Sequence, residues 1–190
     1  MIMQKTKGFT LIELLVIISI IFLMSITIFS NYGKNNEIFA LERSSQKLAQ
    51  NIRRGQEMAI SGLVGSATTC GYGLFFNNVT ESSAVANQYK YIIYEEKDAD
   101  CNAAIRYWQE GTDAAKETIY LETGVKICDI LSDGVTIVSR SISFEPPNPL
   151  TYIGGISSEH TAAIILCVEN DTSITRTITI NNAGLVQLTK

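Results

Sequence analysis

Glu13 is the one charged side chain in a long apolar run near the amino terminus. From Leu14 to Phe29 the run is apolar apart from three hydroxyl residues, Ser19, Ser25 and Thr27. A carboxylate at the middle of a bilayer costs roughly 2.5–3.5 kcal/mol on insertion scales. If this run lies in lipid, Glu13 therefore needs a partner or a function.

Four cysteines are the next residues that could do covalent or metal chemistry: Cys70, Cys101, Cys128 and Cys167. They contain no C-x-x-C pair, and only one histidine is present, so a zinc site with closely spaced ligands is not expected. If the body lies outside the cytoplasm, the even count predicts up to two disulfides, with three possible connectivities. Buried free thiols are the alternative.

The other reactive residues form no catalytic constellation. There is no G-x-S-x-G, P-loop or H-E-x-x-H motif, and His160 in "SSEHTAA" is expected in a loop or on the surface. The acidic run "EEKDAD" (95–100) lacks the spacing and glycine of an EF-hand loop, so we expect it to be solvated. Aromatic residues such as Trp108, Tyr89, Tyr91 and Tyr94 are expected to pack rather than to form a stacking platform. We therefore expect a non-enzyme without metal or cofactor.

Length and charge limit the class of protein. The chain has 190 residues, enough for one domain with an appendage, and 46% of them are hydrophobic. Its net charge is −4, and setting Lys5 and Lys7 aside leaves 13 basic against 19 acidic residues, a net charge of −6. Nucleic-acid-binding bodies are usually basic, so a nucleic acid partner is not favoured.

The apolar run predicts a helix that begins close to the amino terminus. A helix from Phe9 to Ser30 would be about 33 Å long, enough to cross a membrane. Lys5 and Lys7 would hold the leading segment in the cytoplasm and place the body outside. A cleaved secretory signal, a lipoprotein signal and a plain anchor are alternatives, but none of them accounts for Glu13.

A second helical pattern follows the apolar run. "NYGKNNE" (31–37) contains weak helix formers, and Gly33 could loosen the helix there. Beyond it, one stripe recurs at helical spacing and is expected to pack on a sheet: Leu41, Ser45, Leu48, Ile52, Gly55 and Ala59. Gly62 is a plausible C-cap.

Short β-type runs separated by turn residues fill the remainder of the chain. The predicted strands are 71–76, 89–96, 118–121, 125–130, 136–144, 161–169, 174–180 and 184–188. "LSDGV" (131–135) and "INNAG" (180–184) have turn chemistry, and "FEPPNPL" (144–150) is expected to be an extended connection. Regular spacing of short strands favours an antiparallel, sandwich-like β body.

The stretch "KGFTLIELLVIISIIFLM" closely resembles the amino-terminal signature of type IV pilins and pseudopilins. The resemblance implies that a prepilin peptidase cuts after Gly8 and N-methylates Phe9, so that the apolar helix stays in the mature protein. It also implies that Glu13 pairs with the terminal amine of a neighbouring subunit. Such pairing of two charges in an apolar bundle would set register and assembly.

Looser similarities extend the resemblance along the chain. "LAQNIRRGQEMAISG", "GYGLFF", "LSDGVTI" and "ITINNAGLVQL" resemble segments of the GspH/FimT-type branch of pseudopilins and minor pilins. This implies an α+β fold, in which a long amino-terminal helix with a transmembrane first half packs on a carboxyl-terminal antiparallel β-sandwich-like head. The expected divisions are a leader at 1–8, a transmembrane and assembly helix at 9–30, its amphipathic continuation at 31–62 and a head at 63–190.

The expected function is that of a structural subunit of a type IV pilus or a type II secretion pseudopilus. The implied partners are the prepilin peptidase, other pilin or pseudopilin subunits, an inner-membrane assembly platform and membrane lipid. The expected location is the cytoplasmic membrane, with a single pass and an extracytoplasmic head, followed by the filament. A binding role at the filament tip, in DNA uptake or adhesion, is the alternative, and an anchored extracytoplasmic enzyme is a third.

Overall fold

The structure is a computed structural model that describes residues 8–61, 69–79, 85–98, 101, 106–146, 150–155 and 161–189. It divides into two compact units, Met1–Asn36 and Glu37–Lys190. One helix, α1 (Leu11–Ile60), contributes to both units. The helix continues through 31–37, where the sequence contains weak helix formers.

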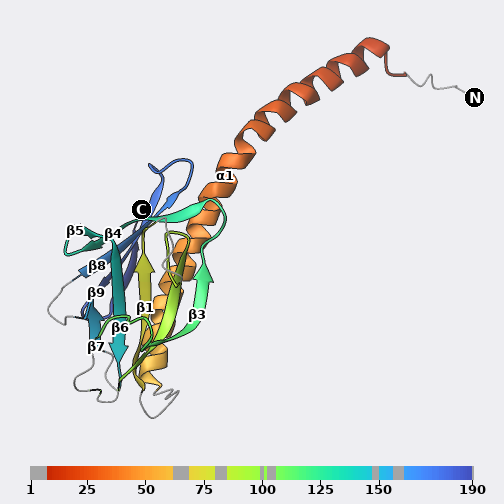
Figure 1. Cartoon of the computed structure of the whole chain (residues 1–190). Helices are drawn as coiled ribbons and strands as arrows, with labels where there is room; N and C mark the ends of the chain where they lie inside the picture. Colours follow the sequence, from red (N-terminus) through yellow and green to blue (C-terminus); the bar gives the residue numbers. More distant parts are fainter. Residues whose placement is uncertain are drawn as a thin grey trace, which may run out of the picture. The chain divides into compact units, whose positions relative to one another are not determined.

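In the described part of the second unit, ten strands follow the helix (Figure 1). They are β1 (Thr69–Asn77), β2 (Lys90–Lys97), β3 (Ala114–Tyr120), β4 (Val125–Ser132), β5 (Val135–Ile137), β6 (Ser139–Glu145), β7 (Leu150–Ile153), β8 (Thr161–Val168), β9 (Thr175–Asn181) and β10 (Val186–Thr189). The predicted α+β class is therefore confirmed, with a helix followed by antiparallel strands.

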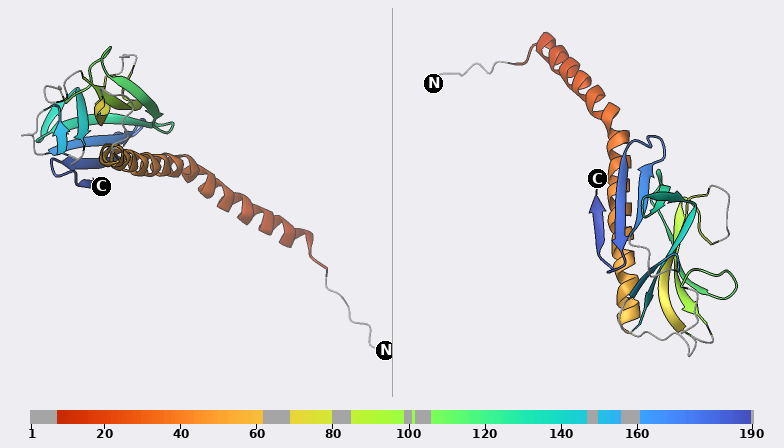
Figure 2. Two further views of the ribbon diagram at one scale, coloured as in Figure 1. Left: turned by 90° about the horizontal axis from the view of Figure 1, so that it is seen from below. Right: turned by 90° about the vertical axis from the view of Figure 1, so that its left-hand side faces the viewer.

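The strands form two five-stranded antiparallel sheets that face each other as layers (Figure 2). Sheet A has the order β3-β2-β1-β6-β7, and sheet B has the order β10-β9-β8-β4-β5. Alternate side chains along a strand point to opposite faces, so each strand gives one set of side chains to the space between the sheets. In β1 that set is Tyr72, Leu74 and Phe76.

The predicted helix stripe is the buried face of α1 within the second unit. Leu41, Leu48, Ile52 and Ala59 are fully buried, and they belong to the same core as Leu74 and Phe144 of sheet A. Gly55 allows close packing, because a Cβ at this position would lie 3.0 Å from Leu74 Cδ1 and 3.2 Å from Phe144 Cε2.

Polar contacts fix the helix to both sheets. Arg54 pairs with Glu117 of β3 at 2.7 Å, and Arg43 pairs with Glu122 just beyond β3. On the side of sheet B, Arg176 of β9 donates to Glu42 at 2.9 Å, and Gln56 donates to the carbonyl of Gly184 at 2.6 Å.

The strand predictions differ from the structure in two places. The predicted strand 136–144 is two strands, because β5 pairs with β4 in sheet B whereas β6 pairs with β1 in sheet A. The extended chain thus crosses from one sheet to the other near Val138. The stretch 144–150 was predicted to be a connection throughout, but Phe144 and Glu145 end β6 and Leu150 begins β7.

Candidate functional site

The amino-terminal motif begins with a reciprocal cap on α1. The backbone N–H and the hydroxyl of Thr10 both donate to Glu13 Oε2, each at 2.8 Å. In return, the backbone N–H of Glu13 donates to Thr10 Oγ1 at 3.3 Å. This is a capping box, in which a Thr at the N-cap and a Glu three residues later satisfy each other's backbone donors. The cap starts the helix just after Gly8 and Phe9.

The peptide bond between Gly8 and Phe9 lies outside the helix. Gly8 is exposed, and a Cβ added there would meet no other atom within 4 Å. Phe9 is 78% exposed. Within the described part of the chain, both residues of this bond are therefore open to solvent.

The first half of α1 exposes its apolar side chains in the single chain. The exposed large apolar side chains between Phe9 and Ile26 belong to Leu, Ile, Val, Phe and Met residues. Around Glu13 lies a shallow depression of about 340 Å³, lined by Phe9, Ile12, Glu13, Val16 and Ile17. The lining of this depression suits an apolar binding partner, and Glu13 adds one carboxylate to it.

No membrane span is identified among the helical residues whose side chains the structure describes.

The structure selects one of the three possible cysteine pairings. Cys70 of β1 is bonded to Cys101, and Cys128 of β4 is bonded to Cys167 of β8. The first disulfide closes a loop of 31 residues that contains β2, and the second joins neighbouring strands of sheet B. Among the described cysteines none is free.

The acidic run 95–100 is not simply a solvated loop. Glu95 and Glu96 are both buried in β2. Burial acts to raise the pKa of Glu95, but hydrogen bonds from Lys116 and Thr69 hold that pKa below its ordinary value. For Glu96, burial is the largest effect and raises the pKa to about 7, although Arg106 acts in the opposite direction. The two glutamates are therefore part of sheet A rather than of a solvated loop, and Glu95 is paired with Lys116 at 2.6 Å.

Several predicted residues lie outside the described part of the chain. They are Lys5, Lys7, Gly62, Asp100 and His160.

Thr10 is the residue that the sequence reasoning missed. The signal was present, because "TLIE" has the Thr-x-x-Glu spacing of a capping box directly before an apolar run. Glu13 was assigned a partner in another subunit, whereas in the single chain its carboxylate already accepts two hydrogen bonds from Thr10.

Comparisons with known proteins agree with the motif. Residues 3–29 match the family described as the prokaryotic N-terminal methylation motif. Among solved structures, the chain is similar to the type IV minor pilin FimU of Pseudomonas aeruginosa, with a TM-score of 0.44 and 11% sequence identity. That similarity covers 84% of this chain and 92% of the other. No curated protein sequence matches the chain. The amino-terminal segment of the chain therefore carries the prokaryotic methylation motif over residues 3–29.

Proposed function

We propose that the chain is a minor pilin or pseudopilin of the GspH/FimT type, a non-catalytic structural subunit of a type IV pilus or a type II secretion pseudopilus. One observation carries this proposal: the methylation motif leads into helix α1, whose large apolar side chains from Leu11 to Ile26 are exposed in the single chain. Burying a large apolar side chain contributes about 1.5–3 kcal/mol, so this surface strongly favours lipid or other helices over water.

In this proposal, residues 9–30 first hold the chain in the cytoplasmic membrane with the head outside. Cleavage after Gly8 gives Phe9 a free α-amine, and this amine remains protonatable after methylation, with a pKa near 8. Glu13 of an incoming subunit then pairs with the Phe9 amine of a subunit already in the filament. An ion pair in an apolar bundle is favourable only where both charges are present and aligned, which makes the pair a register device.

The experiment is to express the full chain with and without an active prepilin peptidase and to measure its intact mass and amino-terminal sequence. With the peptidase, we expect loss of Met1 to Gly8 and one added methyl group on Phe9. Gly8→Val serves as the matched control, because it should block cleavage, and no atom of the described residues lies within 4 Å of a Cβ placed at this position. A chain that still begins at Met1 in the presence of the active peptidase would overturn the proposal.

A further inference from the structure

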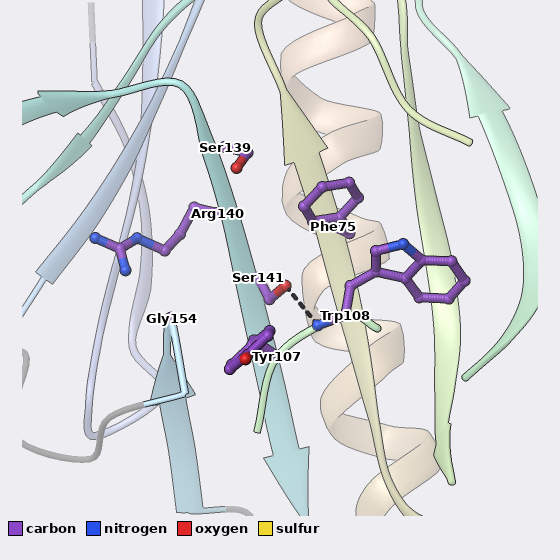
Figure 3. A pocket seen from close by; sticks show the side chains of 7 residues that line it. All are labelled: Phe75, Tyr107, Trp108, Ser139, Arg140, Ser141 and Gly154. Atoms are coloured by element: carbon purple, nitrogen blue, oxygen red, sulfur yellow. Dashed lines mark hydrogen bonds between the residues drawn. The ribbon is translucent and has the colours of Figure 1, made fainter. Parts of the chain in front are cut away.

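A pocket lies on the face of sheet A that points away from the core. Phe75 of β1 alternates with the core residues Leu74 and Phe76, and Ser141 of β6 alternates with the core residue Ile142, so both lie on this outer face. The pocket has a volume of about 330 Å³ and is lined by Phe75, Tyr107, Trp108, Ser139, Arg140, Ser141 and Gly154 (Figure 3).

Aromatic rings form one side of the pocket. The rings of Phe75 and Trp108 are nearly parallel, with 23° between their planes and 6.3 Å between their centroids. Figure 3 shows both rings on one side of β6, with Gly154 and Arg140 on the other and Tyr107 over the strand itself. Ser139 and Ser141, two residues apart on β6, supply hydroxyl groups between these two sides.

The wall that carries Tyr107 and Trp108 is held in place by hydrogen bonds. The backbone N–H of Trp108 donates to Ser141 Oγ at 2.9 Å, and Ser143 Oγ donates to the carbonyl of Arg106 at 3.0 Å. The edge of the indole packs against Tyr94, with 5.4 Å between the centroids and 71° between the planes.

Arg106 ties the same wall to the first disulfide. Its guanidinium donates to Glu145 Oε1 at 2.8 Å and to the carbonyl of Cys101 at 2.7 Å, and Cys101 is bonded to Cys70. The Arg106 side chain is only 7% exposed. This wall of the pocket is therefore fixed in position, because buried contacts hold it rather than exposed side chains.

From this lining we infer that the pocket binds one pyranose ring of a carbohydrate. A pyranose has a face of C–H bonds and a rim of hydroxyl groups. The C–H face fits the electron-rich faces of Phe75 and Trp108, and the rim fits the hydroxyls of Ser139 and Tyr107. A few polar groups set among aromatic faces are typical of small-molecule sites. This inference goes beyond the proposed function and does not depend on it.

Charge disfavours a nucleic acid as the occupant, although bases also stack on aromatic rings. Among the described residues that line the pocket, Arg140 is the one cation. The nearby guanidinium of Arg106 is already paired with Glu145, and the whole chain carries a net charge of −4. A phosphate backbone would need more positive charge than this.

Trp108 is the only tryptophan of the chain, so its fluorescence reports this pocket alone. The full chain, kept in a zwitterionic detergent without a sugar headgroup, is titrated with the methyl glycosides of glucose, galactose, mannose, N-acetylglucosamine and glucuronic acid. We expect a saturable change in emission with at least one of them, and magnetisation transfer from the protein to the same sugar by NMR.

Two variants and two matched controls test the geometry by their Kd values. Phe75→Leu removes one ring face and should weaken binding by roughly three- to tenfold. Replacing Cys70 and Cys101 by Ser releases the wall and should weaken binding, whereas replacing Cys128 and Cys167 by Ser leaves the pocket unchanged because that disulfide lies in sheet B. Tyr120→Leu, on an exposed aromatic residue of β3, should bind like the wild type.

The inference is overturned if none of the sugars binds, or if Phe75→Leu binds the sugar as tightly as the wild type. It is also overturned if benzoate or thymidine monophosphate binds at Trp108 while every sugar fails. A chain that is not cleaved by the peptidase but binds a sugar would count against the proposed function and leave this inference standing.

Discussion

Glu13 has two possible partners, and they belong to different states of the protein. In the single chain its carboxylate accepts both donors of Thr10. In the proposed filament it would pair with the amine of a neighbouring Phe9. The first role needs only an acceptor oxygen, whereas the second needs a negative charge, so substitutions can separate them.

We predict that Glu13→Gln and Glu13→Ala both lower incorporation into filaments. Glutamine keeps an acceptor oxygen for Thr10, so helix capping is retained while the charge is lost. Alanine also removes the acceptor for the two Thr10 donors, whereas Thr10 Oγ1 still accepts from the backbone N–H at position 13. Filament incorporation is measured by immunoblotting of sheared filaments, with intact mass as the control for normal processing. Normal incorporation of the glutamine variant would contradict the charge-pair role.

Glu96 is a buried carboxylate with an imperfect partner. Neither of its oxygens has a hydrogen-bond partner among the described residues, and Arg106 Nη1 lies 3.6 Å away. Burial raises its pKa from 4.5 to about 7, although Arg106 acts in the opposite direction; the carboxylates of Asp113 and Glu145 add to the rise. Between pH 4.5 and about pH 7, the Glu96 carboxyl is therefore protonated in the folded state and ionised in the unfolded state.

A raised pKa in an acid means that stability decreases as pH rises from about 4.5 to about 7. We predict that Glu96→Gln removes this decrease, so that the variant gains roughly 1–3 kcal/mol relative to the wild type between pH 4 and pH 8. Denaturant unfolding at a series of pH values measures the difference. Glu57→Gln, on the exposed face of α1, is the control and should follow the wild-type profile. A constant difference between Glu96→Gln and wild type across this range would refute the prediction.

At the scale of elements, the packing of α1 on the sheets follows from its apolar spacing. Ile52 is fully buried, whereas Ile60 of the same helix is 57% exposed. We predict that Ile52→Ala lowers the free energy of unfolding by about 2–5 kcal/mol, because it leaves a cavity between the helix and the sheets. Ile60→Ala should change it by less than about 0.5 kcal/mol. Equal losses in a denaturant series would contradict the assigned face.

The elements that the sequence predicted well are those with a strong local period. The stripe from Leu41 to Ala59 repeats at helical spacing, and the residues between its members are largely polar. All eight predicted strands overlap observed ones. The separation of β5 from β6 could not be predicted, since both are extended and only their partners differ. β7 has four residues next to the prolines, which is too short for an alternating pattern to show.

The part of the candidate site that lies within one short sequence motif could be predicted. "GFTLIE" identifies the residues at the start of α1, and its Thr-x-x-Glu spacing also contains the cap. The disulfide partners were not predictable, because they depend on which strands become neighbours. Cys128 meets Cys167 only because β4 and β8 pair, with a bulge between Ile127 and Asp129. The pocket at Trp108 likewise depends on a distant segment that crosses sheet A.

At the scale of the whole molecule, two disulfides stabilise the second unit. They close loops of 31 and 39 residues, so each should contribute about 2–4 kcal/mol by restricting the unfolded chain. We predict similar losses in thermal stability for the Cys70/Cys101 and Cys128/Cys167 serine pairs, and additive losses when both pairs are replaced. An unchanged melting temperature in a strong reductant, with reduction verified by mass, would contradict this.

Neither disulfide involves α1, and this has a mechanical consequence. A pulling force applied at the first turn of the helix reaches the sheets through apolar contacts, hydrogen bonds, ion pairs and the main chain that follows the helix, but through neither disulfide, because the disulfides begin at Cys70. Under tension the helix should peel away first, while the two closed loops keep their residues from extending. In single-molecule stretching, the oxidised chain should therefore gain less contour length than the reduced chain. In such a protein, the helix would detach under tension and return when the tension is released, while the disulfides keep the strands connected.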